Sequence, residues 1–188
     1  MKNKISIDID GILNDYPVCW INYVNIKLNT QFCSREEIED KIGEEKYKVL
    51  KKLYRESDYK ENLTINKEFV NFIEKIRKYY EIIIFTSRPI HDPNYPNLLG
   101  LTERWLRKNN VFYNSICFKS DNEDILKNIP EILFHIEDEI KYAELIAKKG
   151  VQVFLSNQNG NYSNIPKRKN IILFDSMEII EKILFKEI

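Results

Sequence analysis

Short apolar segments alternate with segments of helical periodicity along most of this chain. Six segments have the length and apolar character of strands: residues 2–9, 82–85, 115–118, 132–136, 151–155 and 171–173. Nearly continuous apolar runs of this length are typical of strands that a parallel sheet buries on both faces. Because helical segments separate most of these runs, the pattern predicts an α/β fold, with helices covering both faces of a parallel sheet.

Apolar residues spaced three or four positions apart predict the helices between these strands. The expected helices cover residues 17–28, 44–57, 66–79 and 98–108, a segment that ends at Gly150, and a last segment that Asp175 is expected to cap. Ser34 and Glu37 have the spacing of a capping box, in which each side chain accepts a hydrogen bond from the other residue's amide. This box predicts one more helix start.

The chain is expected to have two structural parts. Residues 15–65 contain no strand pattern, so we expect an all-helical insertion there. Residues 1–14 and 66–188 are expected to form the main body, a three-layer Rossmann-like core around the parallel sheet. A chain of 188 residues is long enough for one hydrophobic core plus an insertion of this size.

The charge balance argues against several classes of partner. Lys plus Arg and Asp plus Glu both number 29, and this zero net charge gives no electrostatic case for a nucleic-acid polymer or a membrane surface. The longest apolar runs are too short to span a bilayer, and the N-terminus enters a strand pattern directly, without the apolar region of a signal peptide. Three cysteines without metal-ligand spacing fit a reducing cytoplasm.

Two aspartates follow the first predicted strand, in the sequence Asp8-Ile9-Asp10-Gly11. Residues i and i+2 of a strand point to the same face, so both carboxylates are expected to project into the crevice beyond the strand end. Two like charges so close need a cation or a shared proton, which indicates a hard divalent ion such as Mg²⁺. One carboxylate is then able to act as a nucleophile. An EF-hand calcium loop does not fit, because its glycine would stand at the sixth position.

Polar residues also follow three further predicted strands. They are Thr86, Ser87 and Arg88 after the second strand, Lys119 after the third, and Glu137 and Asp138 after the fourth. The carboxyl ends of parallel strands meet at one edge of a sheet, so these groups are expected to share a crevice with the first motif. A hydroxyl, an ammonium and two pairs of carboxylates suit phosphoryl chemistry, in which a metal and a lysine neutralise the phosphate oxygens.

Each of these elements alone has a simpler explanation. Thr86 and Ser87 could simply cap a helix or form a turn, and Lys119 could be one of many solvated lysines. Glu137 and Asp138 could be acids that the dipole of a helix N-terminus favours. Their order along the chain, with one group at each predicted strand end, favours a common site.

These groups resemble the four motifs of the haloacid dehalogenase (HAD)-like hydrolase superfamily, in order and over the whole chain. The resemblance implies that Asp8 attacks phosphorus and forms an aspartyl-phosphate. It implies that Asp10 protonates the leaving group and then activates water. It also implies phosphate binding by the region of Thr86 and Ser87 and by Lys119.

The resemblance further implies a magnesium site and a cap. The ligands of Mg²⁺ would be Asp8, the carbonyl group of Asp10, and Asp138, with Glu137 supporting them from outside the coordination sphere. The helical insertion directly after the first motif matches the C1-type cap of the superfamily.

Within the superfamily, the chain resembles the 5'(3')-deoxyribonucleotidase group. The similar stretches are residues 8–15, 84–88, 135–138 and 150–155, although Glu137 stands where many members have aspartate. This resemblance implies a nucleoside monophosphate as substrate, with an aromatic matching Tyr16 packing on the base. We also consider Trp20 and Arg88 as substrate contacts. The alternative for the aromatic residues is packing inside the insertion, and His135, inside an apolar strand, is interpreted as a core histidine.

The predicted function is therefore that of a cytoplasmic, Mg²⁺-dependent phosphomonoesterase, monomeric or homodimeric, that acts on nucleoside monophosphates. A second possibility is a phosphatase of sugar phosphates or of another small phosphorylated metabolite. A non-enzymatic alternative is a phosphate-binding or receiver-like signalling module. Receiver domains carry the phosphoacceptor on a middle strand and lack a helical insertion, so the position of residues 15–65 argues against that alternative.

Overall fold

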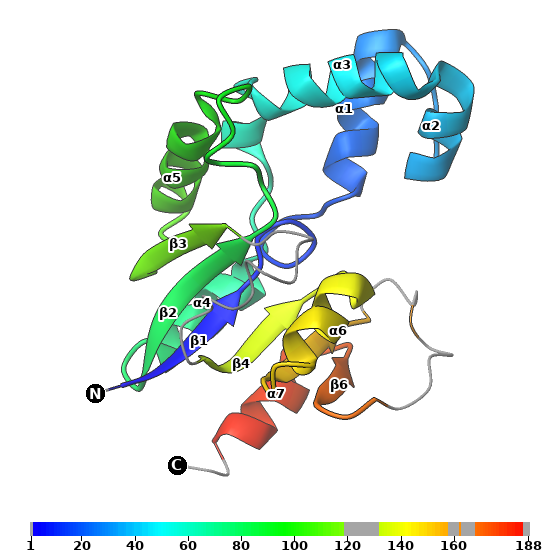
Figure 1. Ribbon diagram of the computed structural model, residues 1–188. Coiled ribbons are helices and arrows are strands. Elements are labelled where there is room, and N and C mark those ends of the chain that lie inside the picture. The colour runs from blue at the N-terminus through cyan, green and yellow to red at the C-terminus, as the bar shows by residue number, and fades with distance from the viewer. Residues whose placement is uncertain (1, 119–131, 158–161, 163–167, 186–188) are drawn as a thin grey trace. The chain divides into compact units, whose positions relative to one another are not determined.

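The computed structural model describes residues 2–118, 132–157, 162 and 168–185 (Figure 1). Six parallel strands form one sheet in the order β3-β2-β1-β4-β5-β6. The strands are β1 (Asn3–Ile7), β2 (Tyr80–Thr86), β3 (Ser115–Phe118), β4 (Ile132–Glu137), β5 (Gln152–Ser156) and β6 (Ile171–Phe174). All six predicted strands are present, and the predicted α/β fold with a parallel sheet is confirmed.

The chain divides into two compact units. The first comprises residues 1–13, 66–87 and 112–188, and the second comprises residues 14–65 and 88–111. The first unit contains the sheet with the helices α4 (Lys67–Ile76), α6 (Ile140–Ala147) and α7 (Met177–Leu184). The second contains α1 (Val18–Leu28), α2 (Arg35–Ile42), α3 (Glu44–Arg55), the 3-10 helix η1 (Lys60–Asn62) and α5 (Leu98–Lys108).

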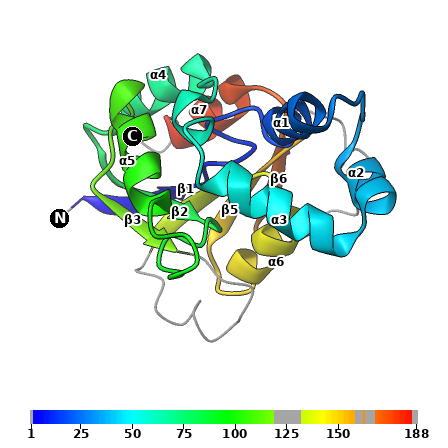
Figure 2. The same cartoon turned by 90° about the horizontal axis from the view of Figure 1, so that it is seen from above.

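The helices of the first unit lie on both faces of the sheet. Figure 2 shows α4 and α7 on one side of the strands and α6 on the other. On the α6 side, Ile83, Phe85, Val153 and Leu155 form a buried cluster with residues of that helix. On the opposite side, Phe69 of α4 packs edge-on against the ring of Phe174. These two apolar layers explain why the strands read as nearly continuous hydrophobic runs.

The order of the strands defines where a ligand is expected to bind. From β1, the chain builds the sheet outward through β2 and β3, and then returns to the other side of β1 to add β4, β5 and β6. In doubly wound sheets, ligands bind at the carboxyl ends of the two strands where this direction reverses. Here those strands are β1 and β4, which bear the first and last polar motifs of the sequence.

The second unit is helical and has its own core. Trp20, Tyr23 and Tyr54 are buried and pack ring against ring. The indole N–H of Trp105 on α5 donates to the carbonyl of Leu63, at 2.8 Å. Residues 15–65, the expected insertion, all lie in this unit. Residues 88–111, which were expected in the core, also group with this unit, because α5 packs on η1.

Two helix starts can be compared with the caps predicted from the sequence. The amide of Glu37 donates to the hydroxyl of Ser34 at 3.1 Å, as predicted, whereas the carboxylate of Glu37 accepts from the amide of Cys33. The last helix begins after Ser176, so the prediction that Asp175 caps it was wrong by one residue. None of the helices in the described part of the chain is both long and apolar enough to cross a membrane.

Candidate active site

Three carboxylates converge at the ends of the two central strands. Asp8 directly follows β1, Glu137 is the last residue of β4, and Asp138 follows it. The amide of Asp8 donates to the carbonyl of Ile136 at 3.0 Å, which ties the first motif to β4. One oxygen atom from each of the three side chains lies within 4.8 Å of the other two. Since Asp8 and Glu137 are buried, this concentration of negative charge calls for a cation.

Gly11 makes room for Asp138 in this cluster. The φ angle of Gly11 is +88°, a conformation that residues with a side chain rarely adopt. A Cβ atom at this position would meet the carboxylate of Asp138. The glycine of the first motif therefore has two roles, because it turns the chain after Asp10 and lets Asp138 approach the backbone of that turn.

Glu137 is fully buried, and hydrogen bonds within the chain engage both of its oxygens. Its Oε1 accepts from the amides of Asp138 and Glu139, at 3.0 and 3.1 Å. Its Oε2 lies 3.1 Å from Nε2 of His135. The carboxylate of Glu137 therefore holds the backbone amides of Asp138 and Glu139 through hydrogen bonds.

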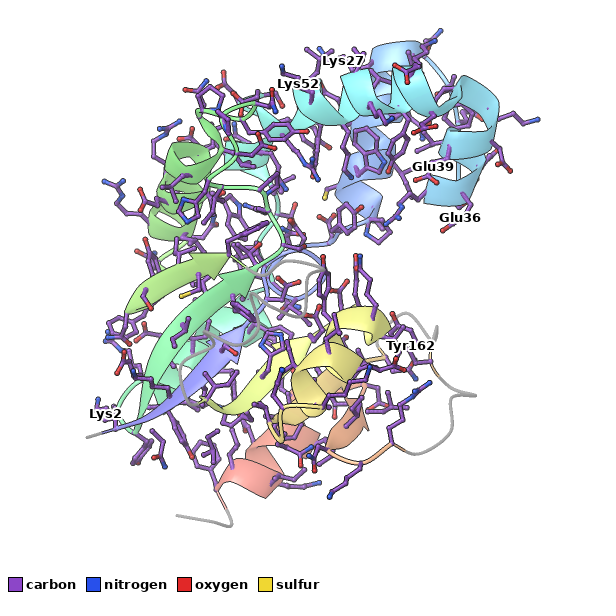
Figure 3. All side chains as sticks on the ribbon, in the orientation of Figure 1. Lys2, Lys27, Glu36, Glu39, Lys52 and Tyr162 are labelled. Carbon is purple, nitrogen blue, oxygen red and sulfur yellow. The ribbon has the colours of Figure 1, made fainter. Side chains whose placement is uncertain are left out.

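The side chain of Tyr162, which was not among the residues predicted from the sequence, also bonds to the turn that carries Asp138. Its hydroxyl donates to the carbonyl of Asp138 at 2.8 Å and accepts from the amide of Ile140 at 3.3 Å. Figure 3 shows Tyr162 beside the start of α6. Burial raises the pKa of this phenol, so it stays protonated as a donor. It stands in a polar connection without periodicity, so no sequence signal marks it.

The remaining motif residues of the first unit are placed as follows. Thr86 ends β2 and has no exposed surface, and the partly buried Ser87 follows it. Asp10 is also partly buried, two residues after Asp8. Lys119, the predicted phosphate ligand after β3, lies outside the described residues. The structure thus brings together Asp8, Glu137 and Asp138 and leaves the role of Lys119 as a prediction.

The three predicted specificity residues belong to the second unit. Trp20 is fully buried, and the ammonium of Lys51 lies 4.3 Å from its ring centroid. The same ammonium lies 4.7 Å from the ring centroid of Tyr16 and donates to its hydroxyl at 3.1 Å. Trp20 therefore packs inside the unit, whereas Tyr16 is partly exposed.

Arg88 is buried as well. Its Nη1 donates to the hydroxyl of Thr102 at 3.1 Å, and its guanidinium carbon lies 5.6 Å from the ring centroid of Trp105. These contacts hold the guanidinium group against α5.

The sequence matches no family model and no curated protein. The structure resembles the HAD-hydrolase YfnB from Bacillus subtilis bound to magnesium, with a TM-score of 0.67, 12% identity, and coverage of 98% of this chain and 99% of that one. It also resembles the haloacid dehalogenase-like protein SP0104 from Streptococcus pneumoniae, with a TM-score of 0.63, 14% identity, and coverage of 97% and 98%.

A third similar structure is CbbY from Rhodobacter sphaeroides in complex with phosphate, with a TM-score of 0.54, 15% identity, and coverage of 94% of this chain and 95% of that one. A variant of CbbY with xylulose-(1,5)bisphosphate matches equally well. At these identities the likeness concerns the fold alone. The chain therefore has the Rossmann-like α/β fold of HAD-like hydrolases.

Proposed function

We propose that this protein is a Mg²⁺-dependent phosphomonoesterase that forms an aspartyl-phosphate on Asp8. The observation that carries the proposal is the convergence of Asp8, Glu137 and Asp138 at the carboxyl ends of β1 and β4. This is the position at which doubly wound sheets bind their ligands. The fold adds support, since similar structures include the HAD-hydrolase YfnB bound to magnesium and CbbY in complex with phosphate.

The carboxylate cluster fits a magnesium ion. Within this cluster, Asp8 and Asp138 offer carboxylate oxygens that lie within 4.8 Å of each other, and hard oxygen donors are the ligands that Mg²⁺ prefers. Asp8, Asp138 and the backbone carbonyl of Asp10 would hold the ion, which when bound supplies positive charge beside the phosphate oxygens. The hydrogen bonds of Glu137 to the backbone support its assignment outside the coordination sphere.

In the proposed reaction, side chains of the first unit serve as nucleophile, as acid and base, and as phosphate ligands. Asp8 attacks phosphorus with a carboxylate oxygen, and the bond from phosphorus to the leaving group breaks. Asp10, two residues further on, gives its proton to the leaving oxygen and then takes one from the water that hydrolyses the acyl phosphate. Thr86, Ser87 and Lys119 hold the phosphate oxygens, which fixes phosphorus in line with Asp8.

For the substrate, we propose a nucleoside monophosphate. The support is the resemblance of residues 8–15 to the first motif of 5'(3')-deoxyribonucleotidases, and the partial exposure of Tyr16. Arg88 remains a candidate for recognising the sugar or a second anionic group. The main alternative is a sugar phosphate, a class that includes the xylulose-(1,5)bisphosphate bound to the CbbY variant.

A substrate panel tests this proposal. Phosphate release is measured with Mg²⁺ from deoxyribonucleoside and ribonucleoside monophosphates and from sugar phosphates, with Asp8→Asn as the control. Selective turnover of nucleotides that Asp8→Asn abolishes is the expected result. Turnover of sugar phosphates alone would support the phosphatase activity and overturn the assignment of a nucleotide as substrate. Phosphate release that survives in Asp8→Asn would come from a contaminant or from another nucleophile.

A further inference from the structure

A buried chain of hydrogen bonds lies directly beneath the carboxylate cluster. Oγ of Ser6 on β1 is 2.7 Å from Nδ1 of His135 on β4. Nε2 of the same ring is 3.1 Å from Oε2 of Glu137. All three side chains have 1% or less of their surface exposed. The chain therefore connects the interior of the sheet to the carboxylates at its edge.

The register of the sheet explains this alignment. Ser6 and His135 are direct partners of the neighbouring parallel strands β1 and β4. Glu137 comes two residues after His135 at the end of β4, so the two side chains share a face of that strand. Asp8 comes two residues after Ser6 and directly follows β1, where its amide still bonds to β4. The serine–histidine pair thus forms a layer one step below the Asp8 and Glu137 carboxylates.

The donors and acceptors of this chain can be assigned. Oε1 of Glu137 accepts from two backbone amides, which stabilises the ionised carboxylate. An ionised carboxylate only accepts hydrogen bonds, so Nε2 of His135 carries a hydrogen and donates to Oε2. This assignment holds whether the ring is neutral or charged. The hydroxyl of Ser6 fixes the other ring nitrogen and thereby the orientation of the ring.

We propose that His135 is a positioning residue of the metal site. Its Nε2–H holds Glu137 in the orientation in which Oε1 binds the amides of Asp138 and Glu139, and this orientation presents the carboxylate of Asp138 to Mg²⁺. The inference rests on the proposed function in one respect, namely that Asp138 is a magnesium ligand. It departs from the interpretation of His135 as a core histidine, because a purely structural residue would affect stability and not metal affinity.

Replacing His135 by either of the two amide residues, Gln or Asn, separates a positioning role from a purely structural one. In His135→Gln, the side-chain amide reaches the position of Nε2 and can still donate to Glu137. In His135→Asn, the amide reaches only the position of Nδ1, near Ser6. Both variants place a neutral amide in the same buried position, so we expect them to change the free energy of unfolding by similar amounts.

The test is the Mg²⁺ dissociation constant, measured by calorimetric titration of the wild-type protein and both variants, with circular dichroism as the check of folding. We expect His135→Asn to bind Mg²⁺ about tenfold more weakly than the wild type, as is typical when an outer-shell partner is lost, and His135→Gln to stay within about threefold. Equal Mg²⁺ affinity of both variants and the wild type would overturn the inference.

Two further measurements cover the cases in which His135→Asn does not fold or the wild-type protein binds no Mg²⁺. If His135→Asn does not fold, Ser6→Ala tests the same chain from its far end, and we expect a smaller loss of Mg²⁺ affinity. An unchanged dissociation constant in that variant would count against the inference. If the wild-type protein itself binds no Mg²⁺, the proposed metal site fails, which is a different result from equal affinities.

Discussion

The carboxylate of Asp138 occupies the space that a side chain at Gly11 would need. A Cβ atom on Gly11 would overlap both Oδ2 and Cγ of Asp138. This close approach joins the turn after β1 to the turn after β4. The glycine of the first motif is therefore a packing requirement of the carboxylate cluster, in addition to being a conformational one.

We expect Gly11→Ala to weaken Mg²⁺ binding by about tenfold or more, because the new methyl group displaces the carboxylate of Asp138. The positive φ angle adds a backbone strain of about 1–2 kcal/mol. Calorimetric titration with Mg²⁺ and urea unfolding measure the two effects separately.

Gly150→Ala is the matched control for this substitution. The φ angle of Gly150 is +87°, nearly that of Gly11, but among the described residues no atom lies within 4 Å of a Cβ placed there. The positive φ angle is expected to cost both variants stability, but only Gly11→Ala is expected to lose Mg²⁺ affinity. Equal Mg²⁺ affinity in the two variants would show that Asp138 is not held against Gly11.

Tyr162→Phe removes the hydroxyl that bridges the carbonyl of Asp138 and the amide of Ile140. We expect the free energy of unfolding to fall by about 1 kcal/mol, and Mg²⁺ affinity to fall as the turn loses a support. Tyr79→Phe, at an exposed tyrosine of the same unit, is the control and is expected to change neither quantity. A dissociation constant unchanged in Tyr162→Phe would limit this tyrosine to a role in stability.

The stability of the second unit is expected to depend on alkaline pH through Tyr47. Burial raises the pKa of Tyr47 to about 12, whereas a tyrosine of an unfolded chain ionises near pH 10. The folded protein therefore holds this proton more tightly, so the stabilisation is complete below pH 10 and is lost as the pH rises towards 12.

Urea unfolding on either side of pH 10 tests this dependence. We expect the free energy of unfolding of Tyr47→Phe to fall less steeply with rising pH than that of the wild type. The same slope in Tyr47→Phe would mean that Tyr47 ionises as readily in the folded protein as in the unfolded chain.

Much of the fold could be predicted because local patterns determine it. The apolar run of β2, the helical spacing of α5 and the capping box of Ser34 each lead to the observed element. The convergence of Asp8 with Glu137 and Asp138 follows from one rule, that the carboxyl ends of parallel strands share an edge.

Other features depend on contacts between distant residues and left no local signal. The bond from Trp105 to Leu63, which helps to join residues 88–111 to the second unit, links positions far apart in sequence. His135 has the appearance of any histidine in an apolar strand until its register with Ser6 is known. The role of Lys119, a cytoplasmic location and a monomeric or dimeric state stay predictions.

The most direct test of the account compares phosphate release by the wild-type protein and by Asp8→Asn, each with Mg²⁺ and with excess EDTA, on the best substrate of the panel. We predict Mg²⁺-dependent turnover by the wild type and a loss of about 1,000-fold or more in Asp8→Asn, with the unfolding temperature preserved. Near-normal turnover by Asp8→Asn would contradict the nucleophilic role of Asp8. Wild-type turnover in EDTA would contradict the metal requirement, and no turnover of any phosphomonoester would contradict the proposed activity.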